Sequence, residues 1–188
     1  MKEDFLPLFR PYLEDALDKR EVKIFLDANE IKSGQSWDAR IKKELLHSKI
    51  LVSIFSPSYF NSEWCKKEYA IIDYRQRQCG YMSDNNPNGI IVPIKIFDGE
   101  HFPEYVTKEG GPQIANFNNF SRVGIRQIKS QLSMDFQEEL LNCVKSVAHA
   151  HRSAPDWNDD WIQADWLTKS VADIDKLNSL LSTKPPVL

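Results

Sequence analysis

The 188-residue sequence contains no apolar run long enough to cross a lipid bilayer, and its first residues show no hydrophobic core of a secretory signal. Cysteine is scarce: Cys65, Cys79 and Cys143 are odd in number and include no CxxC pair. This pattern excludes a disulfide framework and a recognisable zinc site, and it is typical of a reducing compartment. We therefore expect a cytoplasmic protein without a bound metal.

Glycine and clustered positive charge are also in short supply. The chain has 24 basic and 27 acidic residues, a formal net charge of −3, and its Lys and Arg residues are scattered. This distribution argues against a nucleic-acid-binding surface. The 7 glycines form no GxGxxG, GxxxxGKS or GxxxxGKT loop, and no GxSxG motif is present. The sequence therefore offers no loop of the kind that holds a redox dinucleotide cofactor.

Segments of helical and of strand character alternate along the chain. Helical spacing of apolar residues predicts helices over residues 5–19, 36–48, 61–78 and 134–151. Short β-type runs predict strands over residues 22–28, 49–57, 89–97 and 113–120, with an irregular crossover over 98–112. The alternation is typical of an α/β fold with a parallel, doubly wound sheet.

The length suits one domain, which we expect to cover residues 1–154. Residues 155–188 differ in composition. The stretch PDWNDDWIQADW combines three tryptophans with four acids and predicts a short helix. The end of the chain, STKPPVL, has the composition of a linker or tail.

The stretch SPSYFNSEWCKKEY, residues 56–69, puts the single carboxylate of Glu68 inside the apolar arc of a predicted helix. A carboxylate in such a place needs a compensating partner or takes up a proton. One interpretation is a structural ion pair with Arg75, seven residues further on and roughly on the same side. The other is a reacting group, because the helix begins beyond the carboxyl end of strand 49–57, where open parallel sheets bind ligands.

Residues 25–69 resemble the TIR (Toll/interleukin-1 receptor) domain in its bacterial form. The shared features are an aromatic–x–Asp strand end, a glycine loop before a helix, a strand closing in Ser-Pro and a helix start of the type Tyr-x-x-Ser-x-Trp-Cys-x-x-Glu. The residues that carry them are Phe25, Asp27, Gly34, Ser56, Pro57, Tyr59, Ser62, Trp64, Cys65 and Glu68. The segment GIIVPIKIF, residues 89–97, is similar to the family's fourth strand. The resemblance implies a flavodoxin-like sheet.

The resemblance also implies cleavage of NAD+ between nicotinamide and ribose, with NAD+ as substrate and no cofactor. The family's catalytic glutamate matches Glu68, and the tryptophan that lines its substrate pocket matches Trp64. The substrate-binding residues expected beside them are Lys32, Ser56, Tyr59 and Asp27. A single carboxylate suits this reaction, because the leaving group departs as neutral nicotinamide without needing a proton.

We expect such an enzyme to act in bacterial antiphage defence or signalling, to self-associate through TIR–TIR contacts and to answer to a partner effector or sensor. The alternative is a non-catalytic adaptor that binds other TIR domains through the 30–36 loop. A flavodoxin-like receiver domain is a weaker alternative, since the acidic cluster of a phosphoacceptor site is missing. TIR domains begin with a central strand, whereas here residues 1–4 lead straight into a predicted helix; we expect that strand upstream of this sequence.

Overall fold

The computed structural model describes residues 5–19, 22–25, 44–96, 102–103, 113–118, 134–156 and 158. Along the chain the helices and strands are α1 (Phe5–Leu17), β1 (Leu51–Phe55), α3 (Pro57–Asn61), α4 (Glu63–Gln78), β2 (Ile91–Lys95), β3 (Ala115–Asn116) and α8 (Met134–Ser153). Of the helices described, none is both long and apolar enough to span a membrane.

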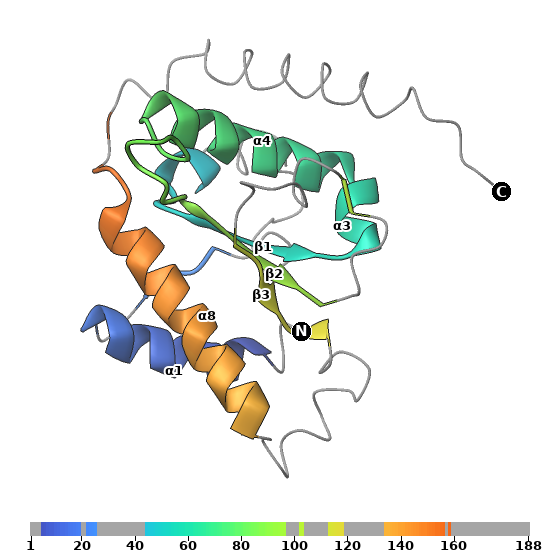
Figure 1. Ribbon diagram of the computed structural model, residues 1–188, viewed down its shortest axis with the longest axis vertical. Helices are drawn as coiled ribbons and strands as arrows, with labels where there is room; N and C mark the ends of the chain where they lie inside the picture. The colour runs from blue at the N-terminus through green and yellow to red at the C-terminus, as the bar shows by residue number, and fades with distance from the viewer. Residues whose placement is uncertain are drawn as a thin grey trace, which may run out of the picture.

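The three strands form one parallel sheet in the order β1-β2-β3. Helix α4 covers one face of the sheet, and α1 and α8 lie together on the other face (Figure 1). This arrangement confirms the predicted α/β fold with a parallel sheet. Because the strands are parallel, their carboxyl ends meet at one edge, beside α3.

Two apolar cores fill the spaces between the sheet and its helices. The core beneath α4 is built from the buried residues Leu45, Phe55, Phe60, Tyr69, Ile71, Ile72, Tyr81, Ile90, Ile91, Phe102 and Ala154. The core against α1 and α8 contains Phe5, Phe9, Leu13, Val92, Ile94, Phe117, Phe136, Leu140, Cys143, Val144, Val147, Ala148 and Ala150. The first four residues of β2 are all buried, as expected of a strand covered on both faces.

A proline stands in the middle of β2 without breaking the ladder. The Leu51 N–H donates to the Ile90 carbonyl at 2.9 Å, and the Ile96 N–H donates to the Phe55 carbonyl at 3.4 Å. Since ladder partners alternate, the even-numbered residues of β2 direct their N–H groups toward β1. Pro93 faces the other way, before the pairing with β3 begins, so its missing N–H removes no bond to β1.

The strand predictions fared unevenly. Strands 49–57 and 89–97 are confirmed as β1 and β2, whereas the described part of the predicted strand 113–120, residues 113–118, contains only the two residues of β3. The predicted strand 22–28 is wrong where it can be judged, because residues 22–25 are irregular. The main-chain polar groups of Val22 are hydrogen-bonded by side chains of α1 instead of by a neighbouring strand. Arg10 Nη1 donates to the Val22 carbonyl at 2.8 Å, and Glu14 accepts from the Val22 N–H at 3.3 Å.

The helix predictions hold with one correction. Helices 5–19 and 134–151 are confirmed as α1 and α8. The single helix predicted over 61–78 is wrong at its start, because Asn61 ends α3 and Glu63 begins α4. Of the helix predicted over 36–48, the described residues 44–47 are helical. The 30–36 loop, most of the 98–112 crossover and most of residues 155–188 lie outside the described residues.

Candidate active site

The turn that follows β1 is fixed by its own side chains. Ser56 has extended backbone angles and caps α3, since its Oγ accepts the Tyr59 N–H at 3.2 Å. Pro57 occupies the first helical position, where a missing N–H costs nothing. The predicted site residue Ser56 therefore shapes the carboxyl edge of the sheet by capping a helix.

Ser62 joins the two short helical segments. Its N–H donates to the Tyr59 carbonyl at 3.2 Å and ends α3, while its Oγ accepts the Cys65 N–H at 3.4 Å and begins α4. One residue thus serves as C-cap and N-cap. Its position sets where the first turns of α4, and with them Trp64 and Glu68, stand relative to the sheet.

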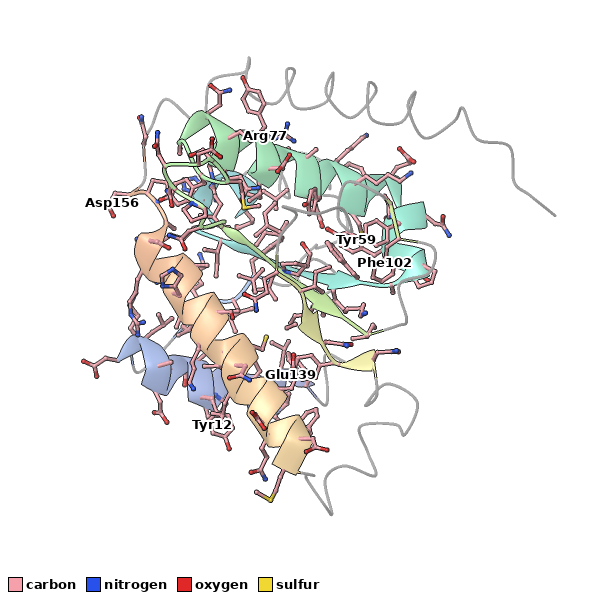
Figure 2. All side chains as sticks on the ribbon, in the orientation of Figure 1. Tyr12, Tyr59, Arg77, Phe102, Glu139 and Asp156 are labelled. Carbon is pink, nitrogen blue, oxygen red and sulfur yellow. The ribbon has the colours of Figure 1, made fainter. Side chains whose placement is uncertain are left out.

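An aromatic cluster lies beneath these turns. The ring of Phe55 is 4.8 Å from Phe60, 6.1 Å from Tyr69 and 5.9 Å from Phe102, measured between centroids. Phe60 and Phe102 are 5.0 Å apart. Figure 2 shows Phe102 beside Tyr59 at the α3 end of the sheet. The cluster gives the carboxyl edge a floor that excludes water, and Phe102 is a contributor that the sequence analysis missed.

The hydroxyl of Tyr59 points into the sheet. It donates to Ser53 Oγ at 3.3 Å, and Ser53 is 1% exposed on β1. The Tyr59 ring is 5.4 Å from that of Phe55 and 5.3 Å from that of Phe60. The hydroxyl of Tyr59 is therefore bound to the strand, and its ring belongs to the aromatic cluster.

Trp64 and Glu68 are one helical turn apart on α4, so their side chains are neighbours. Both are half-buried, and the residues from Tyr69 to Ile72 that follow are buried. The Lys67 ammonium lies 4.9 Å from the centroid of the Trp64 ring, a cation–π contact. Glu68 thus stands where the exposed start of α4 meets its buried middle.

A second carboxylate of α4, that of Glu63, is more exposed than Glu68. Glu63 lies at the exposed start of the helix, and its Oε1 is 2.8 Å from Lys66 Nζ. The hydrogen bond from Lys66, followed by the charge of that lysine, lowers the pKa of Glu63 below its usual value. Glu63 is therefore an ordinary surface ion pair and a natural comparison for Glu68.

The predicted ion pair between Arg75 and Glu68 is wrong, because Arg75 binds main-chain carbonyls instead. Its guanidinium is 1% exposed and donates to three main-chain carbonyls, those of Leu46 at 3.2 Å, Ser48 at 2.6 Å and Lys49 at 2.9 Å. Burial lowers its pKa to about 10, although the nearby Cys79 thiol raises it in part. These carbonyls precede β1, whereas α4 starts beyond the other end of that strand. Between Glu68 and Arg75 the helix therefore runs antiparallel to β1, so the two residues lie toward opposite ends of that strand.

Four of the predicted site residues gather around the joint between α3 and α4: Ser56, Tyr59, Trp64 and Glu68. Lys32 and Asp27 lie outside the described residues. Lys95, which is not among the predicted site residues, ends β2 at its carboxyl end. The sequence feature that draws attention to it is a charged residue at the end of an otherwise apolar, buried strand.

A family model described as the TIR domain matches residues 10–127. The chain is 30% identical over 89 residues to a probable 2′ cyclic ADP-D-ribose synthase, BdTIR, of Brachypodium distachyon, covering 47% of this chain and 40% of that protein. It is 32% identical over 109 residues to the disease resistance protein RPS6 of Arabidopsis thaliana, covering 58% of this chain and 9% of that protein.

A third relative is the disease resistance-like protein CSA1 of Arabidopsis thaliana, 34% identical over 70 residues, which are 37% of this chain and 6% of that protein. The chain spans less than half the length of each of these relatives. The family match covers more than half of the chain and includes β1, α3, α4, β2 and β3. The chain belongs to the TIR domain family.

Proposed function

We propose that this TIR domain cleaves NAD+ at the bond between nicotinamide and ribose, as a glycohydrolase or an ADP-ribosyl cyclase. The observation that carries the proposal is the half-buried carboxylate of Glu68 on the helix that follows the carboxyl end of β1. One relative is named a probable 2′ cyclic ADP-D-ribose synthase, a name that fits the same bond cleavage.

The chemistry needs one carboxylate rather than two. When the C1′–N bond breaks, its electron pair stays on the nicotinamide nitrogen, so the pyridinium leaves as neutral nicotinamide without a proton. The ribose becomes oxocarbenium-like, and a fixed anion above an apolar floor stabilises that charge as it develops. Water then adds its oxygen to C1′ and releases a proton, giving ADP-ribose; capture by a hydroxyl of the same molecule gives a cyclic product.

The surrounding residues divide the remaining work in this proposal. Glu68 provides the anion, and Trp64, one turn earlier, offers an aromatic surface for stacking a ring. Ser56 and Tyr59 hold the frame of the edge through the cap and the Ser53 contact. Lys32 and Asp27 complete the substrate-binding set of the proposal. NAD+ is consumed as substrate, so no cofactor is invoked.

We extend the proposal to immune signalling by self-associating TIR domains. The support is that two relatives are named for disease resistance. The bacterial antiphage setting is supported by the resemblance of residues 25–69 to bacterial TIR domains. In either setting the product of NAD+ cleavage, or the loss of NAD+ itself, is the signal.

The proposal is tested by nicotinamide release. The protein is incubated with NAD+ at high protein concentration, with and without a crowding agent that favours self-association. We expect release by the wild type and by Glu63→Gln, which removes the exposed carboxylate of the same helix. Glu68→Gln is expected to release nicotinamide at the uncatalysed rate. Equal release by Glu68→Gln and the wild type ends the proposal.

A further inference from the structure

Lys95 ends β2 on the face covered by α4. Along β2, Ile91 belongs to the core beneath α4, while Val92 and Ile94 belong to the core on the opposite face. Because side chains alternate along a strand, Lys95 points to the same face as Ile91. The register agrees, since Lys95 pairs with Phe55, a member of the core beneath α4.

Lys95 therefore shares a neighbourhood with Glu68. The ring of Phe55, its partner in the register, is 6.1 Å from the ring of Tyr69, and Tyr69 follows Glu68 in α4. Lys95 thus lies beside Phe55 on the sheet, and Glu68 precedes Tyr69 on the helix that covers this face. Lys95 is the last residue of β2, at the edge where β1 and β2 end side by side near α3 (Figure 1), and Glu68 lies in the second turn of α4, the helix that begins beyond this edge.

A lysine in this place is informative because of what precedes it. Ile91, Val92, Pro93 and Ile94 are all buried, and Lys95 is half-buried. A lysine can lay its aliphatic stem along apolar side chains and carry its ammonium to the water at their border. Here that border is the edge at which parallel sheets bind anionic nucleotides and other ligands.

We infer that Lys95 binds the pyrophosphate of the dinucleotide substrate. This inference rests on the proposed function. The substrate carries its positive charge on nicotinamide and its negative charges on the phosphates. An anion at Glu68 and a cation at Lys95 match these opposite ends, so Lys95 is a substrate-positioning residue and Glu68 the group that acts on the ribose. An ammonium is a compact point charge that suits phosphate oxygens.

The experiment measures equilibrium binding in the Glu68→Gln background, where NAD+ is not consumed. The two probes are NAD+ and nicotinamide riboside, which keeps the nicotinamide and ribose but has no phosphate. Lys95→Gln is expected to weaken NAD+ binding about tenfold or more, as for the loss of a charged hydrogen bond, and to leave nicotinamide riboside unchanged. Lys95→Arg is expected to retain most of the NAD+ affinity.

Lys66→Gln is the matched control, because it removes a lysine near the same edge that is paired with Glu63. It should change NAD+ affinity by less than about twofold. The inference is overturned if Lys95→Gln binds NAD+ as the parent does, if both probes weaken alike, or if the parent binds no NAD+. If Lys95→Gln weakened the binding of NAD+ but not that of nicotinamide riboside, and the wild type released no nicotinamide, the contact of Lys95 with the pyrophosphate would stand and the proposed cleavage activity would be rejected.

Discussion

The hydroxyl of Tyr59 on α3 donates to Oγ of Ser53 at 3.3 Å and so ties the first helix after β1 to the buried middle of that strand. Ser53 is 1% exposed, which makes it one of few polar residues buried in the described part of the chain. Since α3 leads directly into α4, this contact helps to set the position of the candidate site.

Removing this hydroxyl tests its structural role. Tyr59→Phe keeps the ring but leaves Ser53 without this donor, and we expect a loss of about 1 kcal/mol in the free energy of unfolding. Ser53→Ala should cost a similar amount. The double variant should be more stable than the sum of the two losses predicts, because both partners are then gone. Urea denaturation measures all four proteins, and strictly additive losses would contradict the contact.

Ser62 is expected to contribute more to the free energy of unfolding than a surface serine of the same segment. Ser62→Ala removes the cap that accepts the Cys65 N–H, and helix caps contribute about 1 kcal/mol. Ser58→Ala, an exposed position within α3, is the control and should leave stability within about 0.5 kcal/mol of the wild type. Equal stability of the two variants in urea denaturation would show that the joint does not depend on Ser62.

Arg75 is expected to be the most sensitive charged residue of α4. Arg75→Met leaves the carbonyls of Leu46, Ser48 and Lys49 without their donor, which should cost roughly 2–4 kcal/mol. Arg77→Met breaks an ion pair with Asp73 in which the arginine is exposed, and it should cost less than about 1 kcal/mol. Chemical denaturation compares the two, and similar losses would contradict the buried role of Arg75.

The sequence predicted the fold better than it predicted the joints. Apolar runs such as IVPI in β2 and the periodicity of α8 survive in the structure, because burial on both faces or on one face leaves a visible pattern. Ser62 ended one helix and began another within a run that looked continuous, because a cap acts through one local hydrogen bond. Residues 22–25 have side chains suited to a strand but are irregular, because pairing depends on a neighbouring strand, which composition does not encode.

The candidate site was also predicted only in part, because local patterns show which residues of one helix are neighbours but not which distant segments join them. A helix carried Trp64 and Glu68 to one surface, and helical spacing alone gives their adjacency. The partners of Arg75 are carbonyls of the segment before β1, and no local pattern in the sequence reveals that this segment lies against α4. Phe102 and Lys95 reach the edge from later parts of the chain, so only the three-dimensional structure brings them to it.

Alkaline pH should weaken the fold through Cys143. Burial, followed by the charge of Glu139, raises the pKa of this thiol from 9.0 to about 12. Between these values the unfolded chain loses the proton while the folded chain keeps it. The stabilising contribution is therefore complete below pH 9 and is lost as pH rises through about 12.

The measurement is the free energy of unfolding at several pH values from 8 upward. Cys143→Ala should show a shallower fall with pH than the wild type. Val147→Ala is the control, because it also opens space on the buried face of α8 but removes no titrating group. It should lose stability at every pH with the wild-type slope. A Cys143→Ala slope equal to that of the wild type would contradict the linkage.

The claim that Glu68 acts on the transition state is tested most directly by separating binding from cleavage. Affinity for NAD+ and the rate of nicotinamide release from bound NAD+ are measured for the wild type and Glu68→Gln. We predict affinities within about threefold of each other and a release rate at least about a hundredfold lower in Glu68→Gln, as for the removal of a preorganised electrostatic group. Equal release rates from equally occupied proteins would contradict the account.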